Sequence, residues 1–347
     1  MKVEIWEGTH RRRRSLRVII CAAVVAFIGY ALLLATGPVS FTVPELIEVL
    51  TGGGTRTQIT VVWELRLPIA VATVTTGALL GTAGAWTQTA VRNPLASPDV
   101  MGISGGAAVA VVAGTIFLPV QNHASMSVFW WRFILAALGA LTVIVLLWVL
   151  SGSANGTRLV LTGVGISLFS HQAVRFMLSR TDLRETADAQ TWLAGSTGLV
   201  REPALTPLFL GALPFLLIGM YFSRDLPILI HGDVTATVLG VDAAVVRSMM
   251  IIAATGLAAV CVSVTGPIGF VALVAPQLAR ILAGAPTPPP YASASVGAAM
   301  MTLCAVSVNL LPAPVPVGTL TSALGGVALT MLVVRMGRTQ SHDPRKN

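Results

Sequence analysis

Charged side chains are missing from long stretches of this chain. No Asp, Glu, Lys or Arg lies between Arg66 and Arg92, between Arg247 and Arg280, or between Arg280 and Arg335. Several of these stretches contain apolar runs of about 20 residues, the length that a helix needs to cross the bilayer core. A soluble domain has no reason to exclude charge from helices and loops alike over such distances. The sequence therefore predicts an all-α polytopic membrane protein.

Composition supports this class and excludes others. Only 10% of the residues are charged, against roughly 25% in soluble domains. The net charge of +8 would indicate nucleic acid binding in a soluble protein; here it reflects membrane topology, so we expect lipid and no nucleic acid as a partner. Cys21, Cys261 and Cys304 lie in apolar segments at no metal-like spacing. We therefore expect no metal site and no cofactor bound by this chain.

Hydropathy predicts about ten spanning helices within a single transmembrane domain, 18–335. A basic tail, 1–17, precedes this domain and a short tail, 336–347, follows it. The predicted spans are 18–36, 67–90, 100–120, 130–150, 159–178, 205–222, 248–265, 267–283, 292–311 and 317–335. An even number of spans places both termini on one side, which carries the excess of Lys and Arg. The prediction is a multi-pass protein of the cytoplasmic (plasma) membrane with cytoplasmic N- and C-termini.

Glycine and proline are dense in these spans. Small residues at the spacing of Gly77, Gly81 and Gly84, or of Gly102, Gly105 and Gly106, are typical of close helix packing in lipid. Helix breaks near Pro94, Pro98, Pro267 and Pro276 are a second expectation, beside close packing. Spans two to five and seven to ten each open with a Gly-rich helix followed by a Pro-containing stretch. Their members lie five spans apart, so the chain is predicted to contain two halves of inverted topology.

The longest polar interruption is the cytoplasmic loop 223–247. Asp233 is a suitable N-cap for a short helix, Gly240 is a suitable break, and a second helix is expected after it. Val234, Thr237 and Val238 fall on one face of the short helix, with Leu239 beside them. A lipid-bound interfacial helix usually carries basic residues on its polar face, and this one has none before Arg247. A protein partner is the preferred interpretation.

Six segments together resemble one known family, the permease subunits of binding-protein-dependent ABC importers for iron–siderophores, haem and cobalamin. The resemblance runs from about Leu65 to Leu332. The matching segments are Leu65-Arg-Leu-Pro68; Gln88-Thr-Ala-Val-Arg-Asn-Pro-Leu-Ala96 with Gly102 and Gly105-Gly-Ala107; Trp192-Leu-Ala-Gly-Ser196; 236–247 around Leu239-Gly240; Gly266-Pro-Ile-Gly-Phe-Val-Ala-Leu-Val-Ala-Pro276 with Arg280; and Pro316-Val-Gly318 with Gly325-Gly326.

The resemblance implies partners and residue roles. It implies a second permease, two cytosolic ATP-binding subunits and an extracytoplasmic substrate-binding protein. Coupling helices are implied at Asp233, Ala236, Leu239, Gly240 and Arg247. A pathway or gate is implied at Arg92, Asn93, Pro94, Gly102, Gly266, Gly269 and Pro276. Docking of the binding protein is implied at Arg66, Trp192 and Arg201. The chain has no GxxxxGK[ST] phosphate loop, so we expect a non-enzymatic subunit and ATP hydrolysis on its partners.

The sequence also departs from the family pattern. Ile69 stands where a second arginine is common, Val315 where an acidic residue is common, and Gln277 where histidine is usual. Ser307, Val308 and Asn309 replace the usual Asp and Arg at the end of the ninth span. The missing docking arginine favours a heterodimer with an unlike permease over a homodimer.

Alternatives remain for residues and for function. Arg92 and Arg280 are equally interpreted as arginines that anchor helix ends in lipid, and His171 with Arg175 as a structural pair. An ion-coupled transporter would need carboxylates or histidine near the midplane, and no Asp or Glu lies in a predicted span. An intramembrane hydrolase would need a motif that is not present. We expect transport of an intact ferric siderophore, with cobalamin or haem as the alternative substrate.

Overall fold

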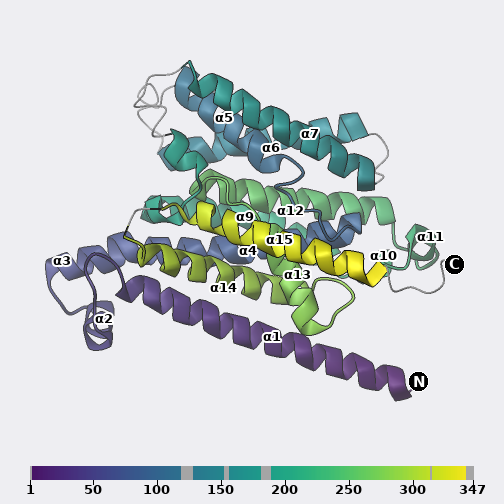
Figure 1. Ribbon diagram of the computed structural model, residues 1–347, viewed down its shortest axis with the longest axis horizontal. Coiled ribbons are helices and arrows are strands. Elements are labelled where there is room, and N and C mark those ends of the chain that lie inside the picture. Colours follow the sequence, from purple (N-terminus) through teal and green to yellow (C-terminus); the bar gives the residue numbers. More distant parts are fainter. Residues whose placement is uncertain (1, 119–127, 152–155, 181–188, 313–314, 341–347) are drawn as a thin grey trace.

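The described part of the chain is a bundle of roughly parallel and antiparallel helices without strands (Figure 1). The computed structural model describes residues 2–118, 128–151, 156–180, 189–312 and 315–340. Ten helices coincide with the ten predicted spans. They are α1 (Lys2–Ala35), α4 (Leu67–Val91), α5 (Ile103–Phe117), α6 (Val128–Ser151), α7 (Gly156–Leu178), α9 (Leu205–Phe222), α12 (Ala243–Thr265), α13 (Val271–Ala283), α14 (Pro290–Asn309) and α15 (Val317–Gln340).

Short helices occupy both ends of the bundle. The α2 end carries α2 (Val43–Leu50), α3 (Arg56–Ile59), the π-helix η1 (Thr60–Arg66) and the 3₁₀ turns η3 (Thr197–Leu199) and η4 (Glu202–Ala204). The opposite end, called the α11 end below, carries α10 (Leu226–Leu229) and α11 (Asp233–Val238). The start of α1 and the end of α15 also lie at the α11 end (Figure 1).

Length and composition make most of the ten helices membrane-spanning. Six described helical segments are long and apolar enough to cross a bilayer: Arg12–Ala35, Arg56–Val91, Trp130–Ser151, Glu202–Phe222, Ala243–Thr265 and Pro290–Asn309. Three shorter apolar helices are Ile103–Phe117, Val271–Ala283 and Val317–Met331. Residues 2–17 of the predicted basic tail are helical and continuous with the first span in α1. Arginine is a good helix former, so charge alone does not end the helix.

The two halves have equivalent contacts. In the first half, α5 packs on α6 and α7; in the second, α13 packs on α14 and α15. The opening helix of each half also contacts the other half, with α4 against α13 and α14, and α12 against α5 and α6. Helices α4 and α12 contact each other at the centre and run in opposite directions. This arrangement confirms the predicted inverted repeat.

Glycines bring the central helices into close contact, as predicted. A Cβ atom on Gly77 would overlap the carbonyl oxygen of Gly297 on α14, and one on Gly84 would overlap the carbonyl oxygen of Ala272 on α13. The backbone of α4 can therefore lie in direct contact with the backbones of α13 and α14. The close packing of α4, α13 and α14 depends on these missing side chains.

Each half contains a helix break, at opposite ends of the bundle. Helix α4 ends at Arg92, which is left-handed at φ 54°, and α5 begins only after Gly102, at φ 82°. Helix α12 ends at Gly266, at φ 72°, and α13 begins after Phe270, at φ 68°. The expected breaks near Pro94, Pro98 and Pro267 are therefore present.

One expected break is wrong. Pro276 lies inside α13 and is buried there. A proline removes one backbone donor from a helix, but α13 is packed against α4, α14 and α1. Packing on three sides retains helical geometry through this residue.

Candidate transport and coupling site

The predicted coupling residues form a compact unit at the α11 end. Helix α11 ends in a Schellman motif, in which the N–H of Val241 donates to the carbonyl of Ala236 and the N–H of Gly240 to that of Thr237. Gly240 supplies the left-handed residue of this motif at φ 80°. Asp242 then caps α12 by accepting from the N–H groups of Ala244 and Val245, at 3.0 and 3.1 Å. The predicted order of helix, glycine break and second helix is confirmed.

Asp233 does not cap α11, contrary to our expectation. Gly232 occupies the N-cap position. The Asp233 carboxylate instead accepts from Arg92 Nη2 at 2.5 Å and from Arg247 Nη2 at 2.9 Å. Arg247 also donates from Nε to the carbonyl of Ala90 at 3.1 Å. These three charged side chains, the ion triad, join the end of α4, the start of α11 and the start of α12.

The ion triad is accessible to water and keeps Asp233 ionised. The side chains of Arg92 and Asp233 are 39% and 53% exposed. Hydrogen bonds from Arg247, and next from Arg92, hold the pKa of the Asp233 carboxyl below its usual range, and partial burial opposes them. Arg92 is thus a structural partner of α11.

The outer face of α11 is apolar, and no part of the chain that the structure describes covers it. Val234 and Val238 are each 81% exposed and Leu239 is 61% exposed, whereas Ala236 is fully buried on the opposite face. An exposed apolar surface of this kind on a small helix is typical of a protein interface. The ion triad and Ala236 hold the helix, while Val234, Val238 and Leu239 form its contact surface.

The predicted gate residues line a small cavity beside the triad. Arg92, Asn93 and Pro94 border a cavity of about 240 Å³ together with Gln277 and Arg280. Asn93 stabilises the turn that follows α4, because its Oδ1 accepts from the N–H of Leu95 at 2.9 Å. The break after α4 and the end of α13 therefore lie on the wall of the same cavity.

A buried amide pair closes this cavity on the inner side. Gln88 Nε2 donates to the carbonyl of Leu273 at 3.0 Å, and Gln277 Nε2 donates to Gln88 Oε1 at 2.5 Å. Both side chains are 3% exposed. Sequence reasoning recognised Gln277 only as a departure from the family pattern and missed the pair. Two glutamines in otherwise apolar spans were the available signal.

The remaining gate residues lie at both helix breaks. Gly102 approaches Gly163 on α7, and Gly266 leaves no room for a Cβ atom beside the carbonyl of Trp192. Gly269 lies near Ser322 on α15. The close approaches at Gly102 and Gly266, together with their positive φ, explain why glycine is required at those two positions.

A second cavity lies beside the start of α5 and the break after α12. Its volume is about 290 Å³, and it lies between α5 and α7 with Ser104, Pro267, His171 and Arg175 in its wall. His171 Nδ1 is 2.8 Å from the carbonyl oxygen of Ser167. Asp99, which sequence reasoning did not single out, lies at the start of this region and accepts from Ser104 Oγ. An acidic residue directly before an apolar span was its signal.

Most of the predicted docking residues are buried or form contacts within the chain. Arg66 is 8% exposed and donates to the carbonyls of Leu34 (2.7 Å) and Val39, with its guanidinium over the Phe41 ring. Trp192 is 7% exposed. An arginine whose donors are used internally has few left for a docking carboxylate. Docking at Arg66 and Trp192 stays a prediction. Arg201 stays partly exposed and donates to two neighbouring carbonyls.

This architecture defines a class: a helical membrane protein built from inverted halves, with an exposed apolar helix at one end. The model of the FecCD transport family matches residues 21–335. The chain belongs to the FecCD transport family.

Several characterised relatives are similar over most of their length. The ferric enterobactin transport system permease protein FepG of Escherichia coli is 30% identical over 92% of this chain and 96% of the relative. The hemin transport system permease protein HmuU of Yersinia pestis is 31% identical over 81% of this chain and 85% of the relative. The iron(III) dicitrate transport system permease protein FecD of Escherichia coli is 32% identical over 80% and 86%.

A solved structure supports the same fold. It is a metal-chelate type ABC transporter in an inward-facing conformation, with a TM-score of 0.78 and 25% sequence identity. The superposition covers 92% of this chain and 99% of the solved chain.

Proposed function

We propose that this chain is the permease subunit of an ABC importer that moves an intact ferric siderophore across the cytoplasmic membrane. The observation that carries the proposal is the apolar face of α11, held by the ion triad against both α4 and α12. These are the opening helices of the two halves, so movement of α11 would reach both halves directly. Relatives named for ferric enterobactin, iron dicitrate and hemin support a chelated iron substrate.

Two cytosolic ATP-binding subunits are the proposed partners of α11. ATP hydrolysis would take place on them, and their closure would tilt the spans through α11. The α11 end would then be cytoplasmic, which agrees with the excess of basic residues assigned to that side. A substrate-binding protein would dock at the α2 end, and a second permease, preferably an unlike one, would complete the pathway.

The cavity between α5 and α7 is proposed as part of the transport pathway. It reaches from Ser104, after one helix break, to Pro267, in the other. A rearrangement at either break would therefore change its shape. His171 and Arg175 give this cavity its polar wall and are its proposed contacts with the chelate.

Uptake in cells that lack this gene tests the proposal. Radiolabelled ferric siderophore and cobalamin are supplied separately under iron starvation, with wild-type, Val238→Glu or His231→Glu protein at equal abundance. Val238 lies on the apolar face of α11, and His231 precedes the helix at the same end. Wild type and His231→Glu should restore siderophore uptake, and Val238→Glu should not. If the wild-type protein restores only cobalamin uptake, the substrate is cobalamin and not a ferric siderophore. Full rescue of uptake by Val238→Glu would contradict coupling through α11.

A further inference from the structure

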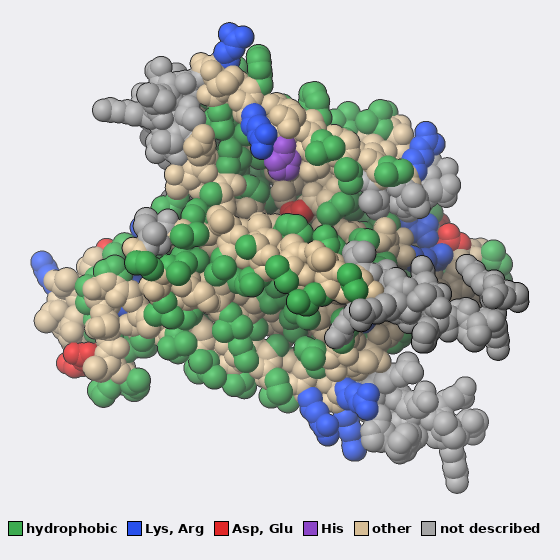
Figure 2. Space-filling model, in the orientation of Figure 1, with side chains coloured by type: hydrophobic (Ala, Val, Ile, Leu, Met, Phe, Trp, Pro, Cys, Tyr) green, Lys and Arg blue, Asp and Glu red, His purple; other side chains and the backbone are tan. Residues whose placement is uncertain are grey.

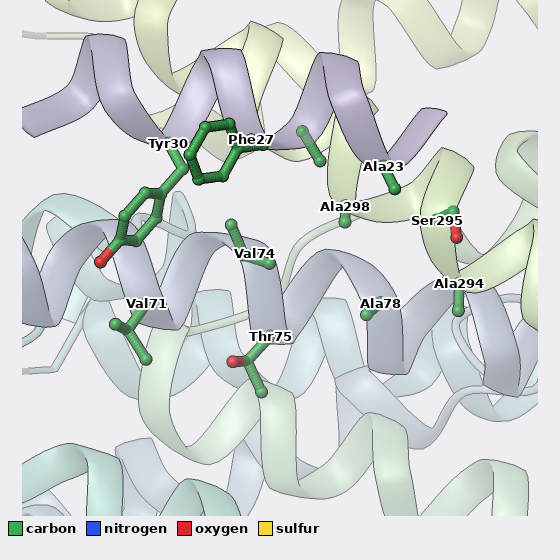
Figure 3. A pocket seen from close by; sticks show the side chains of 11 residues that line it. Ala23, Phe27, Tyr30, Val71, Val74, Thr75, Ala78, Ala294, Ser295 and Ala298 are labelled. Atoms are coloured by element: carbon green, nitrogen blue, oxygen red, sulfur yellow. The ribbon is translucent and has the colours of Figure 1, made fainter. Parts of the chain in front are cut away.

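A groove runs along the outer surface of the bundle between α1, α4 and α14. Its volume is about 480 Å³, and its wall is mainly apolar. Figure 3 shows Phe27 of α1 above Val74 of α4, with Ala23, Ala78 and Ala294 of the three helices farther along. Phe27 is 70% exposed. An exposed apolar side chain on a spanning helix faces lipid, so the groove opens toward the bilayer.

A dense basic cluster lies on the same helix at the α11 end. Arg12, Arg13, Arg14 and Arg17 are exposed on α1. No Asp or Glu occurs in the sequence between Glu7 and Glu45. Clusters of this size next to a spanning helix attract anionic lipid headgroups. The space-filling view shows basic side chains, in blue, gathered at this end of α1 (Figure 2).

Helical geometry connects the cluster with the groove. Arg12 and Ala23 are eleven residues apart in the sequence, about three turns of helix, and therefore share one face of α1. The axial separation is about 16 Å at 1.5 Å per residue. One leaflet of the hydrocarbon core is about 15 Å thick. A lipid with its headgroup at Arg12 would therefore place acyl carbon atoms beside Ala23.

We propose that the groove between α1, α4 and α14 is a binding site for one anionic phospholipid. The phosphate-containing headgroup lies at Arg12 and its basic neighbours, and one acyl chain runs along α1 into the groove. Charge complementarity selects the headgroup, and the apolar wall accommodates the chain. The bound lipid fills the space between α1 and the central helices α4 and α14.

Native mass spectrometry of the purified full-length protein tests this site. Dioleoylphosphatidylglycerol and dioleoylphosphatidylcholine are added in equal amounts, and retained lipids are counted. Wild type should retain one phosphatidylglycerol in preference to phosphatidylcholine. Arg12→Gln should lower that preference about fivefold, the factor expected for one basic residue near an anionic headgroup. Ala23→Trp should lower retention of both lipids, because its ring occupies the groove.

Matched variants separate the site from nonspecific effects. Val24→Trp carries the same ring on the next residue, which is 50% exposed and does not line the groove. Arg224→Gln removes an exposed arginine near α10. Both should bind like wild type. Equal retention of the two lipids by wild type, unchanged preference in Arg12→Gln, or identical behaviour of Ala23→Trp and Val24→Trp would each overturn the proposal. Positions 12, 23 and 24 are exposed, so these variants should fold.

Discussion

Arg92 at the end of α4 and Asp233 at the start of α11 form an ion pair at 2.5 Å, although 141 residues separate them in the sequence. The pair attaches the short apolar helix α11 to the central helix of the first half. Arg247 extends the attachment to α12 through the same carboxylate oxygen. The Asp233 carboxylate therefore connects α11 to one helix of each half.

Removing the charge of Asp233 should loosen α11 with little loss of global stability. Asp233→Asn weakens both ion pairs, and exposed pairs contribute only about 0.2–1 kcal/mol each. We expect a small shift of the midpoint of thermal unfolding and a marked rise in amide hydrogen exchange within 233–241. His231→Gln, which leaves the triad intact, is the matched control. Unchanged exchange in Asp233→Asn would show that Ala236 packing alone holds α11.

Acid should release α11 in a defined pH range. The pKa of Asp233 is lower in the folded chain than its usual value of about 3.9. The pairing therefore stabilises the folded chain above that usual value and is lost as the pH falls through the lowered pKa. Amide exchange of α11, corrected for intrinsic rates, should be constant from about pH 5 to 8 and rise below about pH 4. Asp233→Asn should lack this rise, and a rise near neutral pH in wild type would contradict the assignment.

A single methyl group should destabilise the contact between α4 and α14. In Gly77→Ala the new Cβ atom would overlap the backbone of Gly297, and forced overpacking costs about 1–3 kcal/mol. Gly165→Ala on α7 is the control, since no atom lies within 4 Å of the added Cβ. Thermal unfolding in detergent should show a lower midpoint for Gly77→Ala alone. Equal midpoints for the two variants would contradict the close approach.

The buried amide pair should behave as a coupled unit. Gln277→Leu leaves the side-chain oxygen Oε1 of Gln88 buried without its hydrogen-bond donor. A buried acceptor without a partner lowers the free energy of unfolding by about 1–3 kcal/mol. Gln88→Leu together with Gln277→Leu removes both groups and should be less destabilised than the sum of the two single variants. A double-mutant cycle of unfolding free energies measures this difference. Strict additivity would show that the two side chains do not interact.

Residue patterns predict much of the fold but few of its tertiary pairs. The lack of charge gives the spans, Pro94 and Pro267 mark helix breaks, and Gly240 marks the end of α11, because each reflects a local backbone or solvation requirement. The partners of Asp233 and of Gln277 are distant in sequence, and no local pattern specifies them. Arg66 illustrates the reverse case, in which a family motif does not reveal the local contacts of a residue. Its family role suggested exposure, whereas three internal contacts bury it.

Cross-linking from α11 shows whether this helix contacts an ATP-binding subunit in the assembled transporter. A cysteine at Leu239, in a chain whose exposed Cys21 is replaced by serine, is labelled with a thiol-reactive photocross-linker and irradiated in membranes that contain the assembled transporter. Ile47→Cys on α2, also exposed, is the control at the opposite end. We expect Leu239→Cys to form a cross-linked product with an ATP-binding subunit. The yield of this product should fall when ATP binding changes the interface, and Ile47→Cys should give no such product. No cross-link from Leu239→Cys, or one only from Ile47→Cys, would contradict coupling through α11.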